Sequence, residues 1–368
     1  MKTIRVRLKK SAYNIIVGAK IINRLAEFIS RLGIGGDAYV ITNAAIKNKY
    51  SRVLVKALKQ SHFALRFKVV PATEKSKSIE MVSAVVKDIT RYDRKKRIFI
   101  IAFGGGVIGD LAGFIASIYK RGIPYIQVPT TLLAQVDSSI GGKTAVDLIQ
   151  GKNLLGTFYQ PRLVLSDVNV LKTLDLRQVR SGLAEVIKYG IIKDRQLFAY
   201  LEKRYKDILA FKTGSLEFIV KRCSEIKAGI IRQDEREEKG IRTILNFGHT
   251  IGHAIEAAGG YKRYNHGEAI ALGMLAASEI SHKLGLIDKG TIKRIENLIR
   301  IVGLPTKIRG ISIERIIKAH YRDKKFMGYK NRFVLIKGIG KTRIVENIPL
   351  VIIREALKGK FNHRIAKL

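Results

Sequence analysis

The stretch RIFIIAFGGGVIGDLAGFIAS, residues 97–117, has the pattern of a short apolar strand, a glycine turn and the start of a helix. Gly104, Gly106 and Gly109 fit the pattern G-x-G-x-x-G, in which bare backbone lets a pyrophosphate approach the amides at the positive end of a helix. The alternative is a tight strand-to-helix turn that needs glycine for steric reasons. The stretch therefore predicts an α/β unit that could bind a nucleotide.

The surroundings of this turn differ from the ordinary dinucleotide fingerprint. Strand-like runs at 38–42 and 65–70 come before it, and the next strand, YIQVP at 125–129, is followed by no acidic residue that could hold a ribose. Strand-like and helix-like runs alternate through the N-terminal half, which is typical of a parallel sheet. The expected fold is an N-terminal Rossmann-like α/β nucleotide-binding domain followed by a mainly α-helical metal-binding domain.

The junction between these domains is expected within LKTLDLRQVRSG, residues 171–182, because the pattern becomes mainly helical from about Leu171. The chain has 368 residues, 46% of them hydrophobic, which is enough to bury a large core in two domains. We expect a domain at 1–172 and a domain at 173–368, packed closely because no repeat or Pro-rich linker separates them.

Three of the 7 histidines lie close together in the second half. In LNFGHTIGHAIE, residues 245–256, the apolar spacing predicts a helix that carries His249 and His253 on one face, and His266 follows in YNHGEAIALG. Two histidines at this spacing often arise by chance, but the third favours a metal site.

A carboxylate could complete that site. Glu185 lies in SGLAEVIKYG, residues 181–190, on an amphipathic helical run that carries Lys188 on the same face. Spacing leaves open which three of Glu185, His249, His253 and His266 bind the metal and which one moves protons.

Residues 121–161, from RGIPYIQVPTTLLAQVDSSIGG to GKNLLGTFYQP, are dense in small and polar residues. Three cations and several hydrogen-bond donors there would suit a substrate that carries phosphate and carboxylate groups. The alternative is a solvated loop with ordinary surface charge. The candidate residues are Arg121, Asp137, Lys143, Lys152 and Asn153.

Taken together, these segments resemble the 3-dehydroquinate synthase family of the sugar phosphate cyclase superfamily. The resemblance covers most of the region from Glu74 to Lys325 and follows the family's order. It runs through GGGVIGD, RGIPYIQVPTTLLAQVDSSIGGKTAVD, GKNLLG, SGLAEVIKYG, LNFGHTIGHAIE, HGEAIALGM and RDKK.

The resemblance implies roles that spacing alone leaves open. Zn²⁺ or Co²⁺ would be held by Glu185, His249 and His266, and His253 would transfer protons and contact phosphate. The expected substrate residues are Arg121, Asp137, Lys143, Asn153, Lys188, Lys227, Arg242, Asn246 and Lys324, the last interchangeable with Lys325. The expected NAD residues are Asn43, Glu74, Lys77, Gly105, Gly106, Val107, Asp110, Thr130, Thr131, Lys152, Val170, Leu171, Lys172 and Thr173.

The reaction implied by the resemblance is a step of the shikimate pathway, which leads to chorismate and the aromatic amino acids. The enzyme would be a carbon-oxygen lyase that converts 3-deoxy-D-arabino-heptulosonate 7-phosphate to 3-dehydroquinate and phosphate, with NAD used catalytically. It would be a homodimer in which Arg121 reaches the neighbouring subunit's site. Other cyclases, a metal-dependent dehydrogenase and a basic nucleic-acid-binding protein are the alternatives.

Two segments depart from the family pattern. DEREEKGIR, residues 234–242, has one residue more than usual, so either Glu237 or Glu238 could take the family's acidic position. The usual glycine turn of the E-x-x-K segment is replaced by Ala72 and Thr73, so we expect a different loop shape there with the motif itself intact.

Composition favours a cytoplasmic enzyme that does not enter a membrane. The single Cys223 excludes an intramolecular disulfide and suits a reducing compartment. No segment is long and apolar enough to cross a membrane, and MKTIRVRLKK alternates like a strand and does not resemble a signal peptide.

The net charge of +39 far exceeds what one anionic substrate needs. The basic residues are scattered and accompany no nucleic-acid-binding motif, so we expect surface charge without specific nucleic-acid affinity.

Overall fold

The computed structural model describes residues 1–93, 97–322 and 331–360, which form two compact units. The first unit contains residues 1–174 and 213–236, and the second contains the described parts of 175–212 and 237–368. A single cut at 172/173 does not produce these units, because the segment 213–236 returns to the first one. The domain boundary at that position stays a prediction.

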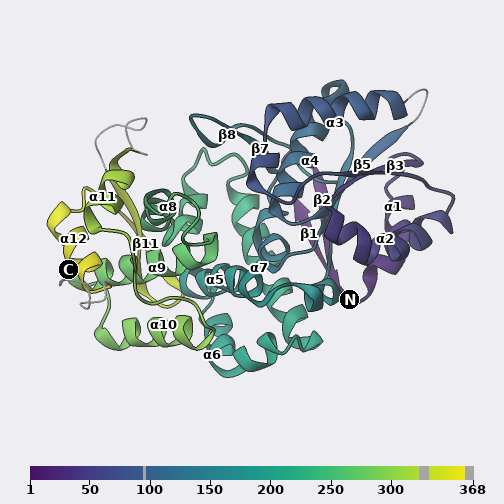
Figure 1. The fold of residues 1–368 in the computed structure, drawn as a ribbon. Coiled ribbons are helices and arrows are strands. Elements are labelled where there is room, and N and C mark those ends of the chain that lie inside the picture. The colour runs from purple at the N-terminus through teal and green to yellow at the C-terminus, as the bar shows by residue number, and fades with distance from the viewer. Residues whose placement is uncertain (94–96, 323–330, 361–368) are drawn as a thin grey trace. The chain divides into compact units, whose positions relative to one another are not determined.

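The first unit is built on a seven-stranded sheet in which all neighbouring strands except one pair are parallel (Figure 1). The exception is the N-terminal pair, which confirms the strand predicted at the start of the chain. In sheet order the strands are β1 (Lys2–Arg7), β2 (Ala12–Gly18), β9 (Leu163–Asp167), β6 (Tyr125–Pro129), β5 (Ile98–Gly104), β3 (Asp37–Thr42) and β4 (Ala64–Val69).

The strand register brings the expected nucleotide residues to one edge of this sheet. Thr42 is opposite Phe103, and Gly104 is opposite Pro129, so β3, β5 and β6 end at nearly the same level. Asn43, Gly105 and Thr130 follow directly after those strands. Ligands of open α/β sheets bind at this carboxyl edge.

Two apolar cores cover the faces of the sheet, and β5 contributes alternately to both. Phe99, Ile101 and Phe103 point to the face covered by α1 (Leu25–Ser30) and α2 (Ala44–Lys59). Ile98, Ile100 and Ala102 point to the face covered by α3 (Ile79–Tyr92) and α4 (Gly106–Ile118). A strand buried on both faces has a continuous apolar sequence, as 98–103 does.

The remaining elements of the first unit include one that sequence reasoning missed. β7 (Lys143–Leu148) and β8 (Gly151–Phe158) form an antiparallel pair within the segment expected to be a polar site region. α7 (Thr213–Gln233) contacts β1 and β2. Short helical turns occupy Ile21–Arg24, Glu74–Ser76, Tyr119–Arg121, Ala134–Ser138 and Val168–Thr173.

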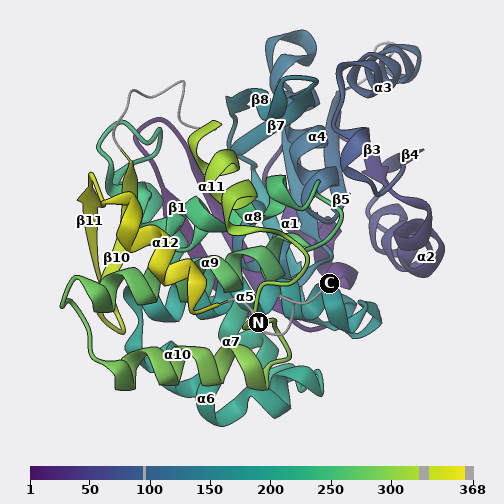
Figure 2. The same ribbon diagram turned by 60° about the vertical axis from the view of Figure 1, so that its left-hand side comes forward.

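The second unit is mainly helical and also contains a hairpin, visible beside its helices in Figure 2. Its helices are α5 (Leu176–Lys193), α6 (Arg195–Leu209), α8 (His249–Ala258), α9 (His266–Lys283), α10 (Lys289–Ile301), α11 (Ile313–Arg322) and α12 (Leu350–Lys358), and a short turn spans Ile241–Asn246. The hairpin strands are β10 (Arg332–Gly338) and β11 (Lys341–Glu346).

The predicted combination of a parallel α/β unit and a mainly helical unit is thus confirmed. None of the helices in the described part of the chain has the length and apolarity needed to span a membrane.

Close packing of α8 against α9 positions the histidines. A Cβ added to Gly273 would lie 2.0 Å from the carbonyl oxygen of Gly248, and one added to Gly252 would lie 3.1 Å from the carbonyl oxygen of Ala269. Only glycine permits this approach of the two backbones. The start of α8 is therefore held against the first two turns of α9.

Candidate functional site

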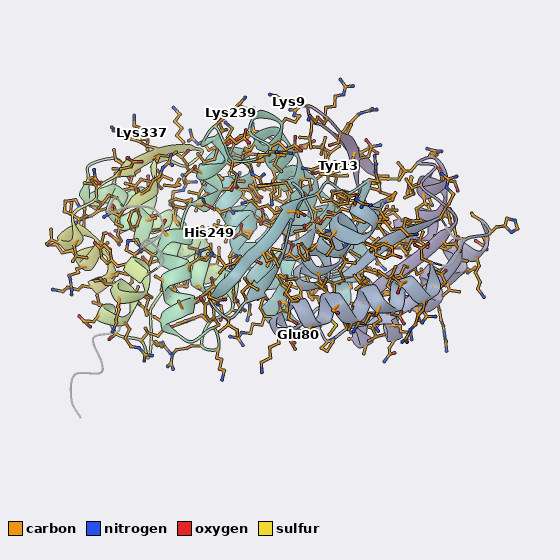
Figure 3. All side chains as sticks on the ribbon, turned by 90° about the horizontal axis from the view of Figure 1, so that it is seen from above. Lys9, Tyr13, Glu80, Lys239, His249 and Lys337 are labelled. Carbon is orange, nitrogen blue, oxygen red and sulfur yellow. The ribbon has the colours of Figure 1, made fainter. Side chains whose placement is uncertain are left out.

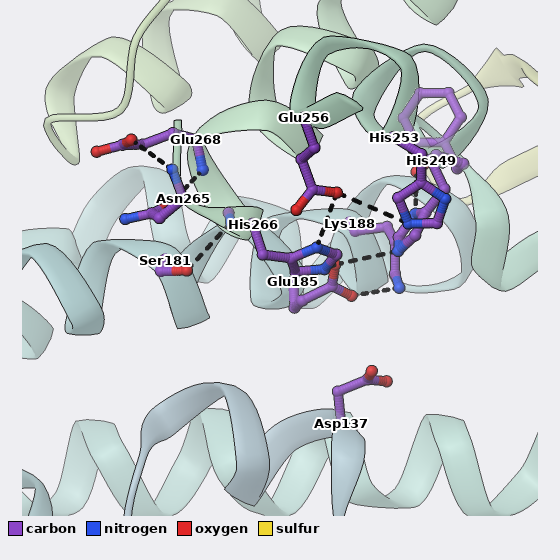
Figure 4. Close-up of polar contacts among 12 residues, drawn as sticks. Asp137, Ser181, Glu185, Lys188, His249, His253, Glu256, Asn265, His266 and Glu268 are labelled. Carbon is purple, nitrogen blue, oxygen red and sulfur yellow. Dashed lines mark hydrogen bonds and ion pairs between the residues drawn. The ribbon is translucent and has the colours of Figure 1, made fainter. Parts of the chain in front are cut away.

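Glu185, His249 and His266 gather in the second unit with one possible ligand atom from each lying within 4.8 Å of the others. Oε1 of Glu185 lies 3.5 Å from Nε2 of His249 and 3.6 Å from Nε2 of His266 (Figure 4). The carboxylate is fully buried, and its Oε2 forms an ion pair with Nζ of Lys188 one helical turn along α5. This ion pair confirms the prediction that Glu185 and Lys188 lie on the same face of one helix.

The first turn of α9 is fixed by hydrogen bonds around His266. The Asn265 side chain accepts from the backbone N–H of Glu268, whose carboxylate accepts from the backbone N–H of Asn265. This capping box satisfies free donors of the helix and sets where α9 begins. Arg177 grips the same carboxylate through two hydrogen bonds, at 2.7 and 2.8 Å.

Burial and charge give two of the histidines opposite proton affinities. Burial, together with the nearby Lys188 ammonium, lowers the pKa of His249 to about 3, which leaves its imidazole neutral. Burial alone would also lower the pKa of His266, but hydrogen bonds to Glu185 and Glu256 raise it to about 10. Two imidazoles and a carboxylate are a donor set that suits a divalent transition metal, so these residues fit Zn²⁺ or Co²⁺, and binding of the ion must displace the proton from His266.

Glu256 is a member of this cluster that sequence reasoning missed. Its Oε2 lies 3.5 Å from Nδ1 of His266 and 3.9 Å from Nε2 of His253, so His253, Glu256 and His266 form a second group that could hold an ion. A carboxylate on the far ring nitrogen of a ligating histidine fixes the orientation of that ring. Its position three residues after His253, on the same helical face, could have revealed it.

The structure brings His253 next to the other two histidines. The ring centroid of His253 is 5.2 Å from that of His249 and 6.1 Å from that of His266, and its side chain is about half exposed. An exposed imidazole beside a metal site can exchange protons with solvent.

The second unit also contains two more of the expected substrate residues, in the segment that follows α7 along the chain. Arg242 is buried, and its Nε lies 3.3 Å from Oε1 of Glu237. Asn246 ends the same short turn and is exposed. Lys324, like its alternative Lys325, lies outside the described residues.

The glycine turn in the first unit has the form expected of a phosphate cradle. Gly105 caps α4, and a Cβ added to it would lie 3.0 Å from Cγ2 of Thr131. A Cβ on Gly106 would lie 3.2 Å from Oγ of Ser138. Bare backbone at the start of a helix fits a pyrophosphate, because amide donors and the helix dipole both favour anions there.

Lys77 is the centre of a polar network beside this turn. Its almost fully buried ammonium lies 2.8 Å from Oδ2 of Asp110 and 3.5 Å from Oε1 of Glu74, and it donates to Oδ1 of Asn153. Although burial opposes it, the negative charge of Asp110 raises the pKa of Lys77. Lys152 lies 3.8 Å from the same oxygen of Glu74. Lys77, which is expected to contact NAD, therefore contacts Asn153, which is expected to contact the substrate.

Other expected nucleotide residues have side chains that are already engaged. The side chain of Asn43 accepts from the backbone of Ile46 and caps α2. Val170 and Leu171 are buried, so only their backbone could meet a ligand. The hydroxyl of Thr173 lies 2.7 Å from that of Tyr50. The others, Val107 in α4, Thr130 and Thr131 after β6, and Lys172, lie on the same edge of the sheet.

Four further substrate candidates belong to the first unit. The ammonium of Lys227 lies 2.7 Å from Oδ1 of Asp137 and also donates to the carbonyl oxygen of Asp137. Lys143 begins β7 and is exposed. Arg121 lies in the turn after α4 and adopts a positive φ of 63°.

Family models match most of the chain in two adjoining segments. Residues 67–181 match the 3-dehydroquinate synthase N-terminal model, and residues 182–326 match the 3-dehydroquinate synthase C-terminal model. The chain belongs to the 3-dehydroquinate synthase family. The expected resemblance is confirmed.

Similar proteins support the same assignment to the 3-dehydroquinate synthase family. A 3-dehydroquinate synthase of Caldanaerobacter subterraneus subsp. tengcongensis is 46% identical over 94% of this chain and 97% of its own length. Two solved cyclases have the same fold. A 2-deoxy-scyllo-inosose synthase complexed with carbaglucose-6-phosphate, NAD⁺ and Co²⁺ has a TM-score of 0.89 at 26% identity, covering 98% of this chain and 100% of its own. A 2-epi-5-epi-valiolone synthase from Streptomyces hygroscopicus subsp. jinggangensis 5008, with NAD⁺ and Zn²⁺ bound, has a TM-score of 0.87 at 27% identity, covering 96% and 98%.

The extra residue by which this chain departs from the 3-dehydroquinate synthase pattern lies in the turn before Arg242. Glu237 supplies the carboxylate that faces Arg242, and it adopts a positive φ of 64°. Of the two candidates for the family's acidic position, Glu237 is the one that faces Arg242, and its assignment to that position stays a prediction.

Proposed function

We propose that the chain is a 3-dehydroquinate synthase, which converts 3-deoxy-D-arabino-heptulosonate 7-phosphate to 3-dehydroquinate and phosphate. The observation that carries the proposal is the cluster of Glu185, His249 and His266 in a chain of this family. The reaction is a step of the shikimate pathway towards chorismate and the aromatic amino acids. Its class is that of a carbon-oxygen lyase acting on phosphates.

The proposed cofactors are NAD and one Zn²⁺ or Co²⁺. The glycine turn at Gly105 and Gly106 would hold the pyrophosphate, and Glu185, His249 and His266 would hold the metal. When bound, NAD would supply reversible hydride transfer at a secondary alcohol, and the metal would supply Lewis acidity towards the substrate hydroxyls. The reaction as a whole has no net redox change.

The chain's own residues would bind and orient the substrate. Lys143, Asn153, Lys188, Lys227, Arg242 and Asn246 offer cationic or amide donors to its carboxylate, hydroxyl and phosphate groups. The ion pair of Lys227 with Asp137 fixes the direction of that ammonium before any ligand binds. Such fixed contacts suit a site that must hold one substrate through several steps.

His253 is the proposed proton carrier. It is the most exposed of the three clustered histidines, and it lies beside Glu256, which can accept a proton or orient the ring. Proton transfer to the leaving phosphate or from a substrate hydroxyl would pass through this imidazole.

Arg121 would bind the phosphate in the site of a neighbouring subunit, so the functional unit would be a homodimer.

We place the enzyme in the cytoplasm, consistent with a single cysteine that is buried. Its positive charge is spread over exposed side chains such as Lys9, Lys239 and Lys337, and nitrogen-tipped side chains project from elements throughout the chain (Figure 3). Binding to duplex DNA should therefore be weak and be abolished by moderate salt.

One assay tests the proposal and separates it from its alternatives. The protein is incubated with the heptulosonate phosphate, a divalent metal and a catalytic amount of NAD, and phosphate and dehydroquinate are measured. Both products should form in equal amounts without accumulation of NADH absorbance. Growth of that signal in proportion to product would support a dehydrogenase. Turnover of a different sugar phosphate in place of the expected substrate would support another cyclase.

A further inference from the structure

The turn that carries Arg121 has an unusual backbone. Lys120 and Arg121 have φ values of 48° and 63°, and Gly122 has a φ of 122°. Residues other than glycine rarely adopt the left-handed region of backbone dihedral angles, because their Cβ atom comes too close to the following carbonyl oxygen. Two consecutive examples persist only where the surroundings hold them in place.

Asp93, at the end of α3, holds this turn from one side. Its carboxylate is almost completely buried, and Oδ2 lies 2.5 Å from the ammonium of Lys120. The same oxygen accepts a hydrogen bond of 3.0 Å from the hydroxyl of Tyr119. Burial and this hydrogen bond raise the pKa of Tyr119 to about 12, so its hydroxyl stays protonated and donates.

Tyr159, directly after β8, holds the turn from the other side. Its hydroxyl donates to the carbonyl oxygen of Ile123 at 2.9 Å and would lie 3.2 Å from a Cβ on Gly122. Its ring stacks on Tyr125, with centroids 5.7 Å apart, and the Tyr125 hydroxyl donates to its carbonyl oxygen. The position of Tyr159 is thus fixed by the central strand β6.

We propose that Asp93 and Tyr159 are positioning residues, which hold the Lys120–Gly122 turn in its left-handed conformation. In this way they fix the direction in which the Arg121 side chain projects from the backbone. The inference rests on the proposed role of Arg121 in binding the substrate phosphate. A guanidinium that is aimed in advance loses less conformational entropy when it binds.

The chain offers a matched control for Asp93. Asp88 lies on the same helix and has the same kind of partners, since it accepts from the hydroxyl of Tyr39 and pairs with a cation, Arg66. Asp88→Asn removes the same charge from α3 without touching the turn. Tyr159→Phe is a second variant, which removes only the hydroxyl next to Gly122.

The first measurement is hydrogen exchange in residues 119–124, read by mass spectrometry on the whole protein. The amides of Gly122 and Ile123 donate to Tyr119 and Ala116, so they report whether the turn is closed. These amides should exchange about tenfold faster in the Asp93→Asn variant than in the unmodified protein. In the Asp88→Asn variant they should exchange at the rate of the unmodified protein. This readout does not depend on catalysis, so it decides whether the turn is held even if the proposed substrate is wrong.

The second measurement is steady-state kinetics with the heptulosonate phosphate. Asp93→Asn should raise KM about tenfold with metal content and NAD affinity unchanged, and Tyr159→Phe should do the same to a smaller extent. Glycine tolerates the left-handed region, so Asp93→Asn/Lys120→Gly should be about 5–30 times more active than Asp93→Asn/Lys120→Ala. A difference of the same size between Lys120→Gly and Lys120→Ala with Asp93 intact would show that it comes from the backbone preference at position 120 and not from the loss of Asp93.

The outcomes are distinct. Equal exchange and equal KM in Asp93→Asn and Asp88→Asn would overturn the inference, and so would faster exchange with an unchanged KM. An unmodified protein that releases no phosphate would refute the proposed function, while the exchange result would still decide whether Asp93 holds the turn.

Discussion

The ammonium of Lys77 lies 2.8 Å from the carboxylate of Asp110, although the two residues are 33 positions apart. Lys77 is only 4% exposed, so its charge depends on the acidic groups around it. The contact joins the turn after β4 to the first turns of α4, and thereby ties the E-x-x-K segment to the glycine turn.

Replacement of Lys77 by Met should weaken both folding and nucleotide binding. It leaves Asp110 without its cation, and breaking such a pair should lower the free energy of unfolding by about 3 kcal/mol. The Kd for NAD, measured by calorimetry, should rise at least about tenfold. Lys75→Met removes an exposed lysine two residues away and serves as the control. Equal NAD affinity in the two variants would contradict the assignment of Lys77 to the nucleotide site.

Replacement of His266 by Ala should remove the metal. Three protein ligands are expected of an open catalytic site, and the two that remain should bind too weakly to retain the ion through dialysis. Metal content by mass spectrometry and phosphate release should fall together.

The control for His266 is His282 on the same helix. Its Nδ1 lies 2.8 Å from the carbonyl oxygen of Ile287, far along α9 from the cluster. His282→Ala should keep metal and activity and lose about 1 kcal/mol of stability at most. Retention of the ion by His266→Ala would refute the proposed ligand set.

The pair of Asp88 and Arg66 predicts a loss of stability in acid. The hydrogen bonds from Arg66, opposed in part by burial, hold the pKa of Asp88 below its ordinary value of 3.8. A carboxyl group whose pKa is lower in the folded chain contributes stability above pH 3.8, and this contribution disappears as the pH falls through the folded value. Asp88 is partly exposed and Arg66 more so, and solvent therefore weakens the effect.

Denaturation at several pH values measures this effect. Arg66→Gln should lower the free energy of unfolding slightly at pH 7, and the difference should shrink below pH 3.8. Arg52→Gln, at an exposed position of α2, should leave the pH dependence unchanged. A difference that grows towards acid would contradict the sign.

Arg121→Lys should reduce transition-state stabilisation by roughly 1–3 kcal/mol, because a lysine cannot grip phosphate with two parallel hydrogen bonds. Metal and NAD binding should be unaffected.

A mixture of inactive Arg121→Ala and inactive His249→Ala tests whether Arg121 acts in the neighbouring subunit. A mixed dimer would combine one intact arginine with one intact metal cluster, so some activity should return. Absence of activity after demonstrated subunit exchange would refute this role.

Local sequence patterns predicted much of the fold and the metal cluster. The apolar run at 98–103 and the glycines after it require a buried strand and a close helix start. The spacing of His249 and His253 requires one helical face. These signals depend on neighbours within a few residues, where periodicity determines geometry.

Contacts between distant segments were not predictable in this way. Nothing near Asn153 indicates that its amide meets Lys77, because that contact depends on the position of the β7–β8 hairpin. The apolar face of α7 shows that the helix is buried, but not that β1 and β2 cover it. The choice among the clustered ligands also needed the family resemblance, since spacing treats His249 and His253 alike.

The return of α7 to the first unit constrains how genes of this family can recombine. A single crossover at any position leaves at least one unit with parts from two parents, because residues 175–212 are inserted between the two segments of the first unit. A crossover at 174/175 would pack a foreign α7 against β1 and β2. Exchange of an intact unit between relatives therefore requires three junctions, at 174/175, 212/213 and 236/237.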